Sequence, residues 1–239
     1  MEPLLNTLEN TRIRAFRDTD ARSVHEVYME AMLHASNSPA HVALNRQLLR
    51  RPSLAMYAAF TAGLLLASRP GTRIPGILLS AGVASIFLSW RRYLWTRFRN
   101  FYQSALQQDL ADIGRHYTPE PSAFWVAEIE RGKDAGKIIG CVGLDASTTP
   151  DPSTVEIRRM VVSPKYQRHG VGSRLLNTAI DHTRAHGLSR INLSTSMYQE
   201  PAIRLYESFG FVEERKVEVV VKFLFIVSKA SLNFYSLVL

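Results

Sequence analysis

The sequence contains almost no cysteine. Cys141 is the only one among 239 residues, which excludes an intramolecular disulfide and a cysteine-based metal site. The seven histidines are scattered and show no spacing typical of metal ligands. We therefore expect no metal. Cys141 has apolar neighbours in a predicted strand, which favours a packing role over a nucleophilic one.

Acidic residues are missing from a long part of the chain. No Asp or Glu lies between Glu30 and Asp109, whereas nine arginines do, and the rest of the chain is nearly neutral although the formal net charge is +8. This basic segment is also the most apolar one. Arginines that flank apolar runs favour a membrane over a nucleic acid as partner, so we expect no nucleic-acid binding. The nine are Arg46, Arg50, Arg51, Arg69, Arg73, Arg91, Arg92, Arg97 and Arg99.

The arginine-rich segment contains two uncharged apolar runs, Leu54–Ala67 and Gly76–Trp90, separated by a turn at Ser68–Pro75. Each run has about 15 residues, which as a helix span about 22 Å against a hydrocarbon core of about 30 Å. Three structures fit: a helical hairpin in the membrane, two short spans, or a hairpin buried in a soluble core. The second run ends in aromatic residues beside arginines, which are typical of a membrane interface and disfavour the soluble hairpin. These residues are Trp90, Tyr93, Trp95, Arg91 and Arg92.

The segment before the runs is predicted to be a strand followed by a helix. Ile13–Asp20 indicates a short strand that leads to a helix cap at Thr19 or Asp20. Apolar residues then recur at helical spacing, and Ser36–Pro39 predicts the end of that helix. At the N-terminus, Met1–Asn6 lacks a basic start followed by an apolar core, so we expect no signal peptide.

The segment after the runs alternates predicted strands and helices. Its apolar spacing changes between the helical and the extended period, with glycine and proline at the expected ends. The expected elements are a helix at Ser104–Tyr117, strands at Phe124–Glu130 and Lys137–Leu144, a strand at Arg190–Thr195, a helix at Glu200–Gly210, and strands at Val212–Val227 and Ser231–Val238.

The stretch Val155–Leu176 joins a strand, a glycine loop and the start of a helix. The strand ends at Ser163, and Gly170-x-Gly172 opens a helical pattern. In this order, backbone amides point at an anion such as phosphate, and the helix dipole favours negative charge there.

The strand before this loop has an irregular apolar pattern. Val155 and Ile157 share one phase, whereas Met160 and Val162 have the opposite phase. A slip of one residue is what a β-bulge produces, here at Arg158-Arg159. A bulge would bend the strand away from its neighbour and leave backbone amides free for a ligand.

Several pieces of this region recur together in one known family. They are Glu156-x-x-x-Met160-x-Val162, Pro164, Gln167-x-x-Gly170-x-Gly172 and Leu205-Tyr206-x-x-x-Gly210-Phe211. Together they resemble the acetyl-CoA signature of the GNAT acetyltransferase superfamily, closely over residues 124–211 and loosely over residues 13–32. The apolar insertion is similar to that of the camello-type branch, which includes cysteine-S-conjugate and aspartate N-acetyltransferases of the endoplasmic reticulum.

The resemblance implies a GNAT fold, an α/β fold with a mixed central sheet and flanking helices, here interrupted by the apolar helical hairpin. Residues 1–45 and 101–239 would form the acetyltransferase domain, and residues 46–100 the membrane insertion. Acetyl-CoA would be the co-substrate, with its pyrophosphate on the amides of the glycine loop and its pantetheine arm on the bulged strand. The implied contacts are Met160, Val161, Val162, Gln167, Arg168, His169, Gly170, Val171, Gly172, Ser173 and Gln199, where many relatives carry Asn instead of Gln199.

Two residues carry the implied chemistry. Glu156 would be the base that takes a proton from the amine, directly or through water, and Tyr206 the acid that protonates the leaving thiolate. The alternatives are a solvated strand residue for Glu156, a packing aromatic for Tyr206, and a role as base or contact residue for His169. The acceptor would be a small amino acid, a cysteine S-conjugate or a lysine side chain. An alternative from another class is a non-catalytic CoA-binding membrane scaffold.

The resemblance also constrains the topology. The first strand and helix belong to the same domain as the motifs after the insertion, so a single pass would split that domain. The insertion must therefore return to its starting side. Because arginines flank it, the positive-inside rule places both ends in the cytosol, at the endoplasmic reticulum or another intracellular membrane.

Overall fold

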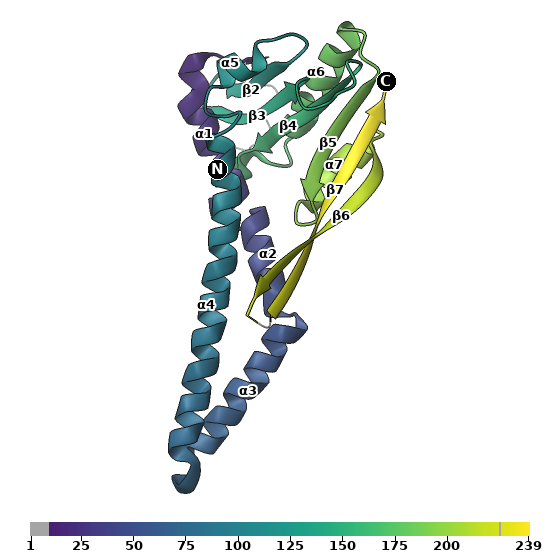
Figure 1. Ribbon diagram of the computed structural model, residues 1–239. Coiled ribbons are helices and arrows are strands. Elements are labelled where there is room, and N and C mark those ends of the chain that lie inside the picture. Colours follow the sequence, from purple (N-terminus) through teal and green to yellow (C-terminus); the bar gives the residue numbers. More distant parts are fainter. Residues whose placement is uncertain (1–9, 225) are drawn as a thin grey trace.

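The computed structural model describes residues 10–224 and 226–239. The N-terminal segment for which we predict no signal peptide lies outside these residues. Figure 1 shows a sheet with helices on both faces and a long helical hairpin that projects from one end of it.

A mixed seven-stranded sheet forms the centre of the domain, in the order β1-β2-β3-β4-β5-β7-β6. Strands β4 and β5 are parallel, and the other neighbouring pairs are antiparallel. Strand β1 comes before the insertion and pairs with β2 after it, so the two parts form one sheet, as predicted. The strands are β1 (Thr11–Ala15), β2 (Ala123–Ile129), β3 (Ile138–Asp145), β4 (Thr154–Val162), β5 (Arg190–Ser196), β6 (Val212–Phe223) and β7 (Ile226–Val238).

Amphipathic helices cover both faces of the sheet. On one face, α6 buries Leu175, Leu176 and Ile180 in a core that also holds Tyr206 of α7. On the other face, α1 buries Val24 and Tyr28 together with α5 and the end of α4. The helices are α1 (Ala21–Met29), α2 (Pro39–Leu48), α3 (Arg51–Ala67), α4 (Arg73–Leu106), α5 (Ile113–Tyr117), α6 (Val171–Ala185) and α7 (Glu200–Ser208).

Helices α3 and α4 form the projecting hairpin (Figure 1). Helix α4 runs without a break across residue 100 and returns to the domain, where Tyr102 and Ala105 are buried. The predicted helix at Ser104–Tyr117 is therefore wrong as a single element: it is the end of α4, a series of turns, and α5. The helical spacing of apolar residues continues through the turns, so it does not reveal the break. A new helix starts at α5, where the side chain of Asp112 accepts from the Arg115 amide at 3.0 Å and caps its first turn.

The hairpin leaves its apolar side chains exposed. Leu65 of α3 and Leu78 of α4 are 65% and 67% exposed. Helix α4, together with the short 3-10 turn before it (Pro70–Leu106), is long and apolar enough to cross a membrane, by length and composition, and only 11% of its most apolar window is buried. Of the three structures that fit the sequence, the hairpin buried in a soluble core is therefore wrong.

Small residues let the two hairpin helices touch backbone to backbone. A Cβ atom on Gly76 would lie 2.3 Å from the Ala67 nitrogen and 2.6 Å from the Gly63 oxygen. Nearby, the Ser80 hydroxyl donates to the Phe60 carbonyl at 3.3 Å. The turn between α3 and α4 is therefore held by close packing rather than by large side chains.

The C-terminal strands divide at a different point from the predicted one. The sequence predicts one strand over Val212–Val227, but β6 ends at Phe223 and β7 begins at Ile226. Leu224 makes the turn with a positive φ of 50°. A leucine is not a residue typical of this conformation, so the sequence carries no turn signal here.

The hairpin contact can be tested with two glycines of the same helix. Gly76→Ala should lower the free energy of unfolding by about 1–3 kcal/mol, because the methyl group meets backbone atoms. Gly82→Ala should instead raise it by up to about 1 kcal/mol, because a Cβ on Gly82 meets nothing within 4 Å and alanine is the better helix former. The measurement is unfolding in detergent, and equal effects at the two positions would contradict the packing.

Candidate functional site

Strand β4 carries the predicted bulge. Cys141 of β3 pairs with Val161, but Gly143 pairs with Arg158, so Arg159 and Met160 together oppose a single residue of β3. Arg159 takes a positive φ of 54°. The slip in the apolar pattern therefore predicted the bulge, but it lies at Arg159-Met160, one residue beyond the expected Arg158-Arg159. The side chains of Met160 and Val162 return to the α6 face.

Beyond the bulge, β4 and β5 separate. The two strands pair from Thr154 opposite Arg190 to Ile157 opposite Leu193, and no further. Strand β5 continues to pair with β7 as far as Ser196, whereas β4 continues beside β3 alone. The part of β4 that follows Ile157 thus borders a split in the sheet on its β5 side, where an extended ligand can bind its backbone.

The glycine loop leads from the split to the start of α6. Arg168 and Gly170 have positive φ values of 65° and 74°, and Gly170 caps the helix. The next residues, Val171, Gly172 and Ser173, are the first of α6, and their amides have no acceptor in the preceding turn of the helix. This is the geometry of an anion site. A Cβ on Gly172 would lie 3.3 Å from the Leu205 side chain, so glycine here allows α7 to approach.

The side chain of Gln167 braces the loop. Its amide nitrogen donates to the Val162 carbonyl at 3.0 Å, and its amide oxygen accepts from Asn37 at 3.1 Å. Nδ1 of His169 lies 2.8 Å from the Gln167 carbonyl. Both residues lie in the predicted place, but their side chains are bonded to the protein itself, so their contact with a ligand stays a prediction.

Tyr206 reaches the bulge from the α6 face. Its ring is buried, and its hydroxyl donates to the sulfur of Met160 at 3.8 Å. Burial raises the pKa of Tyr206 to about 12, so the phenol keeps its proton at neutral pH. Because a thioether is a weak acceptor, this proton is available for a better partner.

Glu156 lies on the opposite face of the sheet. Its neighbours Val155 and Ile157 are buried against α6, so the alternation of the strand directs Glu156 away from that helix. Its backbone is opposite Asp145 on one side and Asn192 on the other. Among the described residues, the half-buried carboxylate has no ion pair. The sheet therefore separates the two predicted catalytic residues, and β4 and β5 part directly after Ile157, the residue next to Glu156.

Gln199 holds the turn between β5 and α7. Its side-chain oxygen accepts from the hydroxyl of Thr195 at 3.2 Å and from the amide of Ser196 at 3.3 Å. Its amide nitrogen lies 3.7 Å from the sulfur of Met32. The predicted contact of Gln199 with a cofactor stays a prediction.

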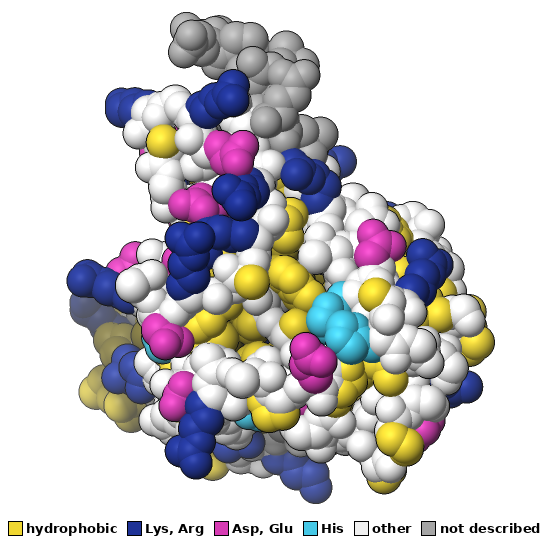
Figure 2. Space-filling view, turned by 90° about the horizontal axis from the view of Figure 1, so that it is seen from above, with side chains coloured by type: hydrophobic (Ala, Val, Ile, Leu, Met, Phe, Trp, Pro, Cys, Tyr) yellow, Lys and Arg dark blue, Asp and Glu magenta, His cyan; other side chains and the backbone are white. Residues whose placement is uncertain are grey.

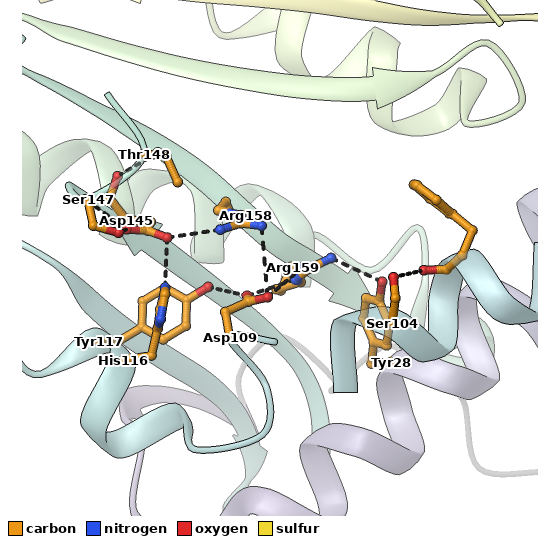
Figure 3. Close-up of polar contacts among 11 residues, drawn as sticks. Tyr28, Ser104, Asp109, His116, Tyr117, Asp145, Ser147, Thr148, Arg158 and Arg159 are labelled. Carbon is orange, nitrogen blue, oxygen red and sulfur yellow. Dashed lines mark hydrogen bonds and ion pairs between the residues drawn. The ribbon is translucent and has the colours of Figure 1, made fainter. Parts of the chain in front are cut away.

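A buried pair of charges supports the bulge, and neither of its residues is among the predicted site residues. The Arg159 guanidinium donates twice to Asp109, at 2.8 Å through Nε and at 2.5 Å through Nη2 (Figure 3). The Tyr117 hydroxyl donates to the same carboxylate at 2.7 Å. Although burial opposes the charge, these partners keep the pKa of Asp109 below its ordinary value. A usable signal was present, because two adjacent arginines in an apolar strand need acidic partners.

A second carboxylate completes the network on this face (Figure 3). Asp145 is fully buried and accepts from Arg158 at 3.0 Å, and His116 lies 2.8 Å away. The amide and hydroxyl of Ser147 bind its other oxygen. Burial alone would raise the pKa of Asp145, but these hydrogen bonds lower it to about 2. Arg158 and Arg159 are thus both matched by carboxylates.

With this geometry the family can be assigned. A model of the acetyltransferase (GNAT) family matches residues 87–211, more than half of the chain. The chain belongs to the GNAT acetyltransferase family. The predicted family and its class, acyltransferase, are confirmed, and so is the predicted mixed α/β sheet with flanking helices.

Curated relatives narrow the family to its camello-type branch. The chain is 33% identical to "Probable N-acetyltransferase camello" of Xenopus tropicalis over 61% of this chain and 64% of that protein, so it spans less than two thirds of this relative's length. It is 31% identical to N-acetyltransferase 8B of Homo sapiens over 83% of each chain. It is 28% identical to N-acetylaspartate synthetase of Xenopus tropicalis over 89% of this chain and 73% of that protein.

Solved structures of the family share the fold. The structure of yncA from Salmonella typhimurium with its cofactor acetyl-CoA aligns with a TM-score of 0.51 and 19% identity, over 96% of this chain and 94% of that one. At this identity the likeness concerns the fold alone.

The role of the positive φ at Arg159 can be tested with two substitutions. Arg159→Gly and Arg159→Ala both remove the guanidinium partner of Asp109, but only glycine adopts a φ of 54° without strain. The alanine variant should therefore be less stable than the glycine variant by about 1–2 kcal/mol. Denaturant unfolding measures the difference, and an alanine variant at least as stable as the glycine variant would contradict a strained bulge.

The acid limit of stability should depend on Asp145. Its pKa is lower in the folded chain than in the unfolded one, so it stabilises the fold above pH about 4, its ordinary pKa, and this contribution is lost as the pH falls towards 2. In the Asp145→Asn variant, the midpoint of thermal unfolding should therefore fall less steeply between pH about 4 and pH about 2 than in the unchanged protein. The measurement is the midpoint of thermal unfolding against pH, and parallel curves for the two proteins would refute the assignment.

Proposed function

We propose that the protein is an acetyl-CoA-dependent N-acetyltransferase that transfers the acetyl group directly to a primary amine. The observation that carries this proposal is the split between β4 and β5 beside the first amides of α6, with Tyr206 at its edge. Family membership supports acetyl-CoA as the co-substrate. A pyrophosphate would bind the amides from Arg168 to Ser173, and a pantetheine arm would bind the backbone of Met160, Val161 and Val162.

The two faces of the split would supply the two proton transfers. Glu156 takes a proton from the amine, directly or through a water molecule, so that the nitrogen can attack the thioester carbonyl. A new C–N bond forms as the C–S bond breaks, and the leaving thiolate takes the proton of Tyr206. The nitrogen, which was protonated at neutral pH and has already given one proton to Glu156, releases its second proton to solvent as the amide forms. Solvent then returns a proton to Tyr206 and removes one from Glu156. Backbone amides of the bulge polarise the carbonyl.

We propose a small amino acid or a cysteine S-conjugate as the acceptor. The similarity to N-acetylaspartate synthetase supports an amino acid. A lysine side chain of a protein is the alternative acceptor. A non-catalytic CoA-binding scaffold is the alternative from another class, and the assay below separates it from the enzyme.

We further propose that the α3–α4 hairpin anchors the protein in a membrane. The exposed leucines, the absence of acidic residues from 31 to 108 and the arginines at its base support this. Since β1 and β2 belong to one sheet, both ends of the hairpin lie on the same side. By the positive-inside rule that side is the cytosol, at the endoplasmic reticulum or another intracellular membrane. Proteolysis of the sheet domain in sealed cytosol-side-out vesicles tests this, and protection of the domain would refute it.

The catalytic proposal predicts a large effect of one hydroxyl. Tyr206→Phe should lower kcat by about 100-fold or more, the range of general acid catalysis, with little change in the KM for acetyl-CoA. Glu156→Gln should also lower kcat, because it removes the base. The assay is thiol release from acetyl-CoA with a panel of amino acids, cysteine conjugates and lysine peptides.

Tyr235→Phe is the matched control, because Tyr235 is equally buried but its hydroxyl donates to Glu213, away from the split. It should keep its activity. Tight acetyl-CoA binding without thiol release by any amine would favour the scaffold, and full activity of Tyr206→Phe would refute the acid role.

A further inference from the structure

The β6–β7 ribbon extends beyond the rest of the sheet. Strand β5 pairs with β7 only as far as Ser196 opposite Leu232. From Ser231 to Ile226, β7 pairs with β6 alone. We call residues 218–224 and 226–231 the tip ribbon. Figure 1 shows it reaching down beside the base of the α3–α4 hairpin.

One face of the tip ribbon packs on the hairpin. Ile226 is buried with Met56 of α3 and with Trp90 and Leu94 of α4. Phe223, which is paired with Ile226, lies with its ring 5.2 Å from that of Tyr93. The end of the ribbon therefore lies at the level of Trp90, where the apolar run of α4 gives way to arginines.

The opposite face of the ribbon is apolar and basic, and it is open. Val220 and Val227 are 46% and 49% exposed, and they share this face with Lys222, Lys229 and Glu218. Glu218 forms an ion pair with Lys229 at 3.1 Å, so the net positive charge of this face comes from Lys222. Leu224 at the turn is 72% exposed. Exposing these apolar side chains to water is unfavourable, and a two-stranded ribbon has little core of its own to offset the cost.

Charge selects the occupant of this face. Arg50, Arg51, Arg91 and Arg92 at the hairpin base add to the charge of Lys222, and no acidic residue lies between Glu30 and Asp109. A second copy of the chain would bring two such clusters together, and the like charges would repel. Anionic lipid headgroups above an acyl layer match both Lys222 and the apolar side chains.

We infer that the tip ribbon is a second membrane-contacting element, with Leu224 and Val227 at the acyl boundary and Lys222 among anionic headgroups. This inference rests on the proposed membrane anchor. It places a lipid contact on β7, the strand that pairs with β5 along the split. The bilayer would then contact both α4 and a strand of the central sheet.

The test labels introduced cysteines and depends on the single native cysteine staying unlabelled. Cys141 is fully buried, and burial raises its pKa to about 12, so it resists labelling. Leu224→Cys is labelled with an environment-sensitive fluorophore in the full chain, reconstituted in phosphatidylcholine vesicles with and without phosphatidylserine. Its emission should shift to the blue, and spin-labelled lipid should quench it. Val212→Cys, at the other end of β6 and 66% exposed, should behave as in water.

A third label separates this inference from the anchor. Leu65→Cys on α3 should be quenched strongly if the hairpin is in the bilayer. Quenching at 65 with water-like emission at 224 would overturn the ribbon contact and leave the anchor standing. Water-like emission at both positions would overturn both, and thiol release would still report the acetyltransferase separately. A blue shift at position 224 that disappears when the protein is diluted would indicate contact with a second copy of the chain. That result would also overturn the inference.

The lysine contribution has its own control. In the labelled Leu224→Cys chain, Lys222→Gln should reduce the extra blue shift that phosphatidylserine produces, with no change in phosphatidylcholine alone. Lys216→Gln, on the part of β6 nearer the sheet, should leave both spectra unchanged. Equal effects of the two substitutions would contradict a specific contact of Lys222 with anionic headgroups.

Discussion

The paired charges of Arg159 and Asp109 are the constraint on which the site depends. Arg159 sits in the bulge with a positive φ, and the carboxylate of Asp109 binds its guanidinium twice. A charge left alone in this buried place costs several kcal/mol. Neither the bulge nor the turn after α4 can therefore move without the other. The bulge comes directly after Ile157 and Arg158, where β4 stops pairing with β5, so the ion pair holds β4 at the point where the split opens.

The same pair connects the split to the hairpin. Asp109 lies three residues beyond the end of α4, whose other end belongs to the apolar hairpin. Helix α4 thus joins the exposed apolar surface to the bulge through one continuous element. At the opposite end of the molecule, basic and acidic side chains are mixed over the surface (Figure 2), in contrast to the acid-free hairpin. This charge distribution supports the proposed membrane anchor.

Local patterns predicted the parts of this structure that local chemistry determines. Three features can each be identified from a few consecutive residues: the glycine loop, the bulge before it and the turn between the apolar runs. The structure contains all three. The pairing of Arg159 with Asp109 joins residues 50 positions apart, and no periodicity reports such a contact. The break after α4 and the turn at Leu224 were also missed, because neither contains a glycine or proline to mark it.

The position of Cys141 bears on how the acetyl group would travel. This thiol lies directly beneath the bulge and donates to the Arg159 carbonyl at 3.4 Å. A covalent acetyl carrier needs an accessible thiolate, but Cys141 is fully buried and its pKa is raised to about 12. Its hydrogen bond makes it part of the support of the bulge instead. With Glu156 and Tyr206 on opposite faces of the sheet, an amine and a thioester that meet in the split would each have a proton partner, so direct transfer needs no thiol from the protein.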